Sequence, residues 1–140
     1  MTLTVSVAVE RWPVAGAFII SRGAKTHVDV IRCEISDGFA VGQAEATPIY
    51  YEGESAEHCA NAIRRFAIGH PEFDRARLLR EMPSGAARNA LDCALWDLQR
   101  QREKPALWQL AGLPKPVATV STLTISLGRP SLMESHARAA

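Results

Sequence analysis

The stretch "PSGAARNALDCALWDLQRQREKPALWQL", residues Pro83 to Leu110, has the spacing of an amphipathic helix with two apolar contacts. At 100° per residue, one stripe collects six apolar side chains: Ala87, Ala90, Leu91, Ala94, Leu95 and Leu98. Asn89, Cys93 and Trp96 fall on the opposite side. The stripe predicts packing on a sheet, and Trp96 predicts a second contact with a different body of protein.

The first half of the chain has the patterns of three antiparallel strands. Leu3, Val5, Val7 and Val9 alternate with small or polar residues, which is the period of a half-buried strand. The runs "HVDVIRCEI" and "FAVGQAEA" follow, and Asp37-Gly38 between them predicts a hairpin. Residues Arg11 to Thr26 contain Pro13, Gly16 and Gly23, and they predict a long irregular loop.

Helices are predicted around this sheet. Ser55 is a candidate N-cap for a helix over Ala56 to Ile68, a shorter helix spans Asp74 to Met82, and Ser84 is a candidate cap for the next. Arg88 and Asp92 have the i,i+4 spacing of a surface ion pair. A short helix after Pro105 is closed by Gly112.

The last part of the chain has the pattern of one βα unit. Val117 to Leu127 predicts a strand that is covered on both faces, as in a parallel barrel. Ser131 and Glu134 have the spacing of a capping box for the following helix. A single parallel strand cannot close a sheet by itself, so we expect the unit to need further strands.

Composition excludes several classes of protein. The 140 residues carry a net charge of +1, and their arginines are interleaved with acids, so no nucleic-acid partner is expected. No segment approaches the roughly 18 apolar residues of a membrane span, and the N-terminus lacks the pattern of a signal peptide. Three widely spaced cysteines argue against disulfides and zinc. A soluble, cytoplasmic protein is the expectation.

Motifs that carry chemistry are few. The chain has no P-loop, nucleophile elbow, zinc-helix or C-x-x-C motif, and its four histidines are isolated. Asp92 and Asp97 are about 140° apart on a helix and cannot converge. Glu45 after "GQA" is either structural or near a site. We therefore predict neither a catalytic residue nor a metal-ligand set in this chain.

Several of these runs, taken in order, resemble a known family: "SDGFAVGQAEATP", "GES" before a helix, "PSGAARNALDCALWDL", "KPALWQLAG" and "TLTISLG". They are similar to the N-terminal part of the enolase superfamily, in its muconate-lactonising subgroup, and most of all to the L-Ala-D/L-Glu dipeptide epimerases. The resemblance covers essentially all 140 residues. Ala44 departs from it, because the family usually has glycine there.

The resemblance implies an α+β fold. Residues 1–112 would form an enolase-like N-terminal capping domain, with a three-stranded antiparallel sheet plus helices. Residues 117–140 would begin a (β/α)₇β barrel whose other strands this sequence does not contain. Two loops, residues 22–26 (the first loop) and residues 48–53 (the second loop), would close over the active site. The barrel wall would be the second apolar contact of Trp96.

The resemblance also implies a chemistry, which is proton transfer α to a carboxylate with lysine bases and Mg²⁺ stabilising an enediolate. Those lysines and metal ligands lie on later barrel strands, so we expect this isomerase-family chain to bind no Mg²⁺ and to be inactive without a barrel. Three positions are implied as contacts of a dipeptide substrate. Lys25 would neutralise a carboxylate, Thr124 would form a hydrogen bond, and Tyr50 would wall the pocket. A solvated lysine is the alternative for Lys25, and a half-exposed loop aromatic is the alternative for Tyr50.

Other functions stay open at this point. The same resemblance admits a cycloisomerase, an acid-sugar dehydratase or an amino-acid racemase in place of an epimerase that recycles cell-wall peptides. A different class is a non-catalytic association module. In either case, the exposed barrel strand predicts self-association or a homo-oligomer.

Overall fold

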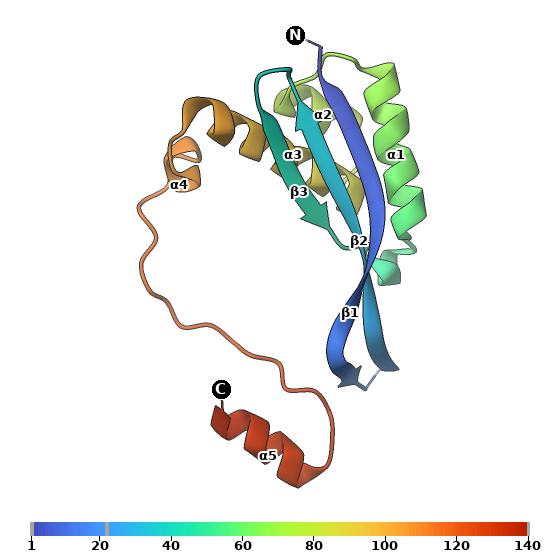
Figure 1. Ribbon diagram of the computed structural model, residues 1–140, viewed down its shortest axis with the longest axis vertical. Helices are drawn as coiled ribbons and strands as arrows, with labels where there is room; N and C mark the ends of the chain where they lie inside the picture. Colours follow the sequence, from blue (N-terminus) through green and yellow to red (C-terminus); the bar gives the residue numbers. More distant parts are fainter. Residues whose placement is uncertain (1, 22, 140) are drawn as a thin grey trace. The chain divides into compact units, whose positions relative to one another are not determined.

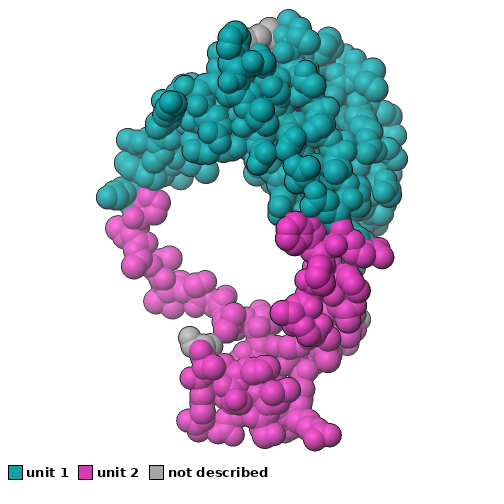
Figure 2. All heavy atoms as spheres, viewed as in Figure 1, with its two compact units in different colours: residues 1–10, 29–115 teal, residues 11–28, 116–140 magenta. Residues whose placement is uncertain are grey.

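The computed structural model describes residues 2–21 and 23–139. They fall into two compact units, which Figure 2 distinguishes. Unit 1 contains residues 1–10 and 29–115, and unit 2 contains residues 11–28 and 116–140. Each unit therefore combines segments that are distant in the sequence.

A three-stranded antiparallel sheet confirms the expected strands of unit 1. Its order is β1 (Thr4–Ile20), β2 (Gly23–Ser36) and β3 (Val41–Ala46), as Figure 1 shows. The register of β2 and β3 runs from Ile31 opposite Ala46 to Ser36 opposite Val41. Ile31, Cys33 and Ile35 alternate along β2 and are fully buried, so one face of the sheet forms the core.

The predicted hairpin between β2 and β3 is confirmed, and Asp37 closes it. Its Oδ1 accepts hydrogen bonds from the backbone N–H groups of Phe39 and Ala40, both at 2.9 Å. Gly38 has a φ of 87°, which a side chain would disfavour. The other oxygen, Oδ2, lies 3.2 Å from Nε of Arg102 in an ion pair without hydrogen-bond geometry.

Acid is expected to weaken the fold through Asp37. The two backbone donors, Phe39 before Ala40, lower the pKa of its carboxyl group below the ordinary value. The corresponding stability is complete above the unfolded-state pKa of about 3.9 and is lost as the pH falls through the lower folded-state pKa. The substitution Asp37→Asn tests this, because it keeps one acceptor oxygen and removes the titrating group. We expect the variant to have the lower urea midpoint at pH 7, and we expect the midpoints of the two proteins to become equal near pH 2. An equal gap at both pH values would contradict this.

Helices cover the sheet at the expected places. They are α1 (Ala56–Gly69), α2 (Arg75–Glu81), α3 (Ala86–Glu103) and α4 (Leu107–Leu110), with a 3₁₀ turn, η1, at Tyr50–Glu52. Ser55 accepts from the N–H of His58 at 3.2 Å, and Asp74 from the N–H of Arg77 at 2.7 Å. These caps begin α1 and α2. Gly112 follows α4 with a φ of 65°, as predicted.

The apolar stripe of α3 packs on the sheet, as its spacing predicts. Ala87, Ala90, Leu91, Ala94 and Leu98 are buried, and Leu95 is half-buried against the same core. Gly42 on β3 allows the close approach, because a Cβ atom there would collide with backbone atoms of Ala94 and Leu98. The sheet and α3 are therefore joined backbone to backbone at this point.

The side of α3 that carries Trp96 has a contact within unit 1, and the expected contact with a barrel wall stays a prediction. The guanidinium carbon of Arg75, on α2, lies 4.0 Å from the ring centroid of Trp96, so a cation of the same unit covers this half-buried ring. Arg75 also pairs with Asp92 at 2.6 Å. The predicted Arg88–Asp92 pair is thus wrong, and Arg88 donates instead to the carbonyl of Met82 at 3.3 Å. Arg75 instead donates from Nε and Nη2 to the two carboxylate oxygens of Asp92, so the tertiary partner takes the place of the local one.

The predicted irregular loop at Arg11 to Thr26 is also wrong. Apart from Ser21 and residue 22, which lies outside the described residues, these positions belong to β1 and β2. We call residues 11–28 the outer ribbon. Pro13 and Gly16 are tolerated because β1 is an edge strand, where a missing N–H donor costs little.

The C-terminal segment, residues 113–129, has no regular secondary structure, so the predicted strand at Val117 to Leu127 is not formed. A strand needs neighbours for its backbone groups, and no further parallel strand is present in residues 2–21 and 23–139. The following helix, α5 (Pro130–Ala139), is formed. It begins one residue before Ser131, so the capping role predicted for that residue is wrong.

Candidate functional site

The three predicted substrate contacts are divided between the two units. Lys25 is exposed on β2 in the outer ribbon, and Thr124 is exposed in the C-terminal segment; both belong to unit 2. Tyr50 belongs to unit 1, where it lies in η1 with 52% of its surface exposed. Its ring meets that of Tyr51 edge to face, with centroids 5.3 Å apart. All three side chains are therefore accessible.

The second loop is closed on itself and then fastened to α3. The N–H of Glu52 donates to the carbonyl of Ile49 at 2.9 Å, and the N–H of Gly53 to that of Tyr50 at 3.1 Å. The Glu54 carboxylate accepts from the N–H of Ile49 at 2.7 Å through Oε2 and from the N–H of Ala86 at 3.0 Å through Oε1. One carboxylate thus holds the start of the loop against the N-terminus of α3.

Glu54 takes the capping role that the sequence suggested for Ser84. The N-cap position of α3 is Gly85, which offers no side chain, and a Cβ atom there would collide with Oε1 of Glu54. A carboxylate at this end also interacts favourably with the helix dipole. The sequence signals of this cap are Glu54 in "GES" and the small residue Gly85 before α3. Neither of them reveals a contact between residues 32 positions apart.

The outer ribbon and the C-terminal segment meet through Ser126. The N–H of Ile19 donates to its Oγ at 2.8 Å, and its hydroxyl donates to the carbonyl of Ala17 at 3.0 Å. Next to it, the N–H of Leu127 donates to the carbonyl of Ile19 at 2.9 Å. The segment that carries Thr124 is therefore attached to the ribbon that carries Lys25.

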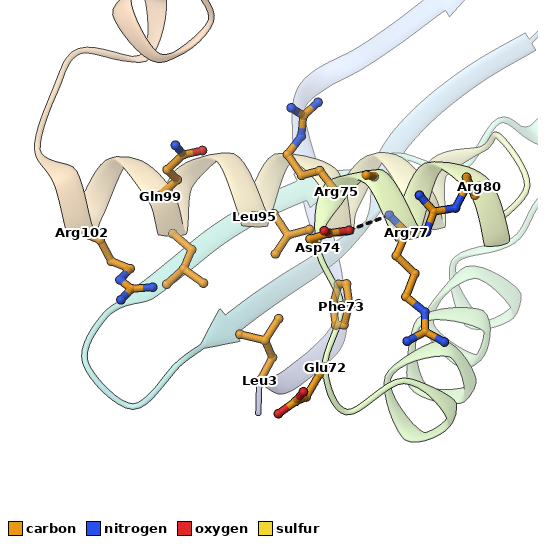
Figure 3. Close-up of a pocket in the computed structure, with 12 residues that line it drawn as sticks. Leu3, Glu72, Phe73, Asp74, Arg75, Arg77, Arg80, Leu95, Gln99 and Arg102 are labelled. Carbon is orange, nitrogen blue, oxygen red and sulfur yellow. Dashed lines mark hydrogen bonds between the residues drawn. The ribbon is translucent and has the colours of Figure 1, made fainter. Parts of the chain in front are cut away.

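A groove of about 800 Å³ lies between α2 and α3 (Figure 3). None of its lining residues belongs to either loop. Leu3, Phe73 and Leu95 contribute its apolar surface. Its arginines are largely neutralised within the chain, by the pairs Arg75–Asp92, Arg77–Glu81 and Arg102–Asp37. Since these charges already have partners, the groove does not have the character of an anion site.

The described residues do not form a metal site or an activated nucleophile. Within residues 2–21 and 23–139, no cluster of three His, Cys, Asp or Glu side chains could hold a metal ion. Burial raises the pKa of the Cys33 thiol to about 12, which keeps it protonated and unreactive. Asp97 accepts from the N–H of Gln43 at 2.9 Å, whereas Asp92 holds Arg75. Glu45 is exposed on β3 opposite Arg32.

Among the described helices, none combines the length and the apolar character that a membrane span would need.

Residues 2–112 match the model of one family, the mandelate racemase / muconate lactonizing enzyme, N-terminal domain. The chain belongs to this family. It is 35% identical over 138 residues to the L-Ala-D/L-Glu epimerase of Escherichia coli K12, which covers 96% of this chain and 42% of that protein. The chain therefore spans about two fifths of this relative's length.

Solved structures agree with this assignment. An enolase family member from Agrobacterium tumefaciens with homology to dipeptide epimerases, determined with sodium and L-Ala-L-Glu, is 39% identical with a TM-score of 0.82. The match covers 96% of this chain and 41% of that one. A dipeptide epimerase from Enterococcus faecalis, in complex with Mg and L-Leu-L-Tyr, has the same fold: 23% identity, TM-score 0.82, with 98% and 42% of the chains covered. The resemblance to the enolase-type capping domain is confirmed.

Proposed function

We propose that this chain supplies the capping domain and the first barrel segment of a dipeptide epimerase that acts on Ala-Glu. The observation that carries the proposal is the 35% identity to the E. coli epimerase, because it extends over 138 residues and includes both loops and the C-terminal segment. These are the parts of the chain that would select a substrate. A cycloisomerase or dehydratase of the same superfamily has no comparable support here.

The proposed reaction is a proton transfer at the glutamyl α carbon. One catalytic group acts as a base and removes the α proton on one face of the carbon. A second group acts as an acid and returns a proton on the other face, so the configuration inverts. Mg²⁺ would stabilise the enediolate, as enolase-superfamily sites do. The described residues of this chain do not fit such an ion, so its ligands and the lysine bases would belong to a barrel.

This chain's own part is to recognise the dipeptide and exclude water. Lys25 would neutralise a substrate carboxylate, Thr124 would donate a hydrogen bond, and Tyr50 would wall the pocket. Their exposure leaves all three able to face a ligand. Self-association through residues 117–127 and a domain boundary near residue 112 also stay predictions.

A role in recycling cell-wall peptides in the cytoplasm is part of the same proposal. The free thiols of Cys33, Cys59 and Cys93 suit a reducing compartment.

An isotope experiment tests the function. The E. coli epimerase is rebuilt with this chain in place of its matching portion, and the product is incubated with L-Ala-L-Glu and Mg²⁺ in D₂O. Proton NMR is expected to show loss of the glutamyl α hydrogen as deuterium replaces it. The barrel portion without this chain is the control. A chimera that folds cooperatively yet exchanges no α hydrogen would exclude the epimerase assignment.

A further inference from the structure

The hydroxyl of Ser126 makes two hydrogen bonds of opposite sense to one strand. It accepts from the N–H of Ile19 at 2.8 Å and donates to the carbonyl of Ala17 at 3.0 Å. Among small side chains, only Ser and Thr can do both through one atom. The hydroxyl is thus both donor and acceptor to the outer ribbon. Its partners Ile19 and Ala17 are 107 and 109 positions away in the sequence.

The neighbouring backbone bond turns this contact into a defined register. Because the N–H of Leu127 donates to the carbonyl of Ile19 at 2.9 Å, both polar backbone groups of Ile19 are held by two consecutive residues of the C-terminal segment. A slip by one residue would break all three bonds. Thr124 is two residues from Ser126, which limits the distance between their Cα atoms to about 7 Å.

We propose that Ser126 is a positioning residue for substrate recognition, which fixes the Thr124 segment against the outer ribbon that carries Lys25. The inference rests on the proposed function, since it needs Lys25 and Thr124 to face one ligand. Ser126 itself touches no substrate in this scheme. Its role is to keep two recognition groups from separate parts of the sequence in one arrangement.

The exposure of the partner residues indicates that the hydrogen bonds of Ser126 position the two segments more than they stabilise the folded chain. Ala17 and Ile19 lie on an exposed part of β1, with 39% of Ile19 accessible. Water can therefore satisfy their backbone groups when the hydroxyl is removed, so the folded chain should tolerate the change. What is lost is the specific arrangement of the two segments.

The tie itself is tested on the chain as it stands. Ser126→Ala is expected to speed amide hydrogen exchange at Ile19 and Leu127 by about tenfold, the equivalent of one net hydrogen bond. Ser126→Thr keeps the hydroxyl and should restore slow exchange. Ser121→Ala, an exposed change in the same segment, is the matched control, and the amide of Leu91 reports the intact core of unit 1. Unchanged exchange at Ile19 in Ser126→Ala would overturn the proposal.

Its role in recognition is tested in the chimera. Ser126→Ala is expected to raise KM for L-Ala-L-Glu about tenfold while kcat changes less than about twofold, because uniform binding is lost and chemistry is not. Ser126→Thr should return KM to near its original value. Faster amide exchange with an unchanged KM, or a kcat loss without a KM change, would refute the positioning role. A parent chimera with no activity would count against the proposed function, while the exchange experiment would still decide whether Ser126 makes the tie.

Discussion

Gly42→Ala is expected to destabilise unit 1 by more than about 2 kcal/mol, in the range of overpacked cores. A Cβ atom at this position would collide with the carbonyl oxygen of Ala94 and the backbone N of Leu98, and would lie 2.7 Å from the Cα of Leu98. Backbone atoms in the middle of a helix cannot rotate away as a side chain can. The strand and α3 would have to separate along their most closely packed contact. Urea unfolding followed by far-UV circular dichroism measures the loss.

Gly69→Ala is the matched control for that variant. A Cβ atom at Gly69, the last residue of α1, meets nothing within 4 Å. The substitution also lowers the entropy of the unfolded chain, so its effect should be neutral or slightly stabilising. If Gly42→Ala were as stable as Gly69→Ala, the close approach of β3 and α3 would be disproved.

Glu54→Ala is expected to cost about 2 kcal/mol, because it removes a charged acceptor from two backbone donors. The N–H groups of Ile49 and Ala86 would lose their partner, and the second loop would be released from α3. We expect faster chymotrypsin cleavage after Tyr50 or Tyr51 in addition to the lower unfolding free energy. Thermal unfolding and timed proteolysis measure the two effects separately.

Two further variants show whether Glu54 acts through its carboxylate. Glu54→Gln keeps one acceptor oxygen, so its loss should be about half that of Glu54→Ala. Glu52→Gln changes an exposed acid in the same loop and should leave both measurements nearly unchanged. Equal behaviour of the Glu52 and Glu54 variants would be incompatible with the fastening of the second loop described above.

Local patterns predicted much of unit 1 correctly. The spacing of apolar residues identified the face of α3 that is buried, and Asp37-Gly38 identified the hairpin. Ser55 and Asp74 were recognised as the start of α1 and α2. Each of these features depends on residues within about one helical turn or one hairpin, and so the information lies in adjacent positions.

Predictions failed where the partner is distant in the sequence. Arg75 takes Asp92 and the face of Trp96, and Glu54 takes the end of α3, although nearer candidates existed. In the outer ribbon, β1 pairs with β2 despite Pro13 and Gly16, because each strand supplies hydrogen-bond partners to the other. Val117 to Leu127 has a strand's composition but forms no ladder with a parallel strand among the described residues, and it stays irregular.

For the candidate site, the resemblance to a family, and not spacing, singled out Lys25, Tyr50 and Thr124. The sequence by itself determined which faces are apolar, where the chain turns and which family the capping domain belongs to. Only the tertiary structure decided that Glu54 fastens the second loop and that Ser126 joins the Thr124 segment to the ribbon of Lys25. The physical reason is that a backbone donor bonds to whichever acceptor the fold brings within about 3 Å, and sequence spacing does not encode that distance.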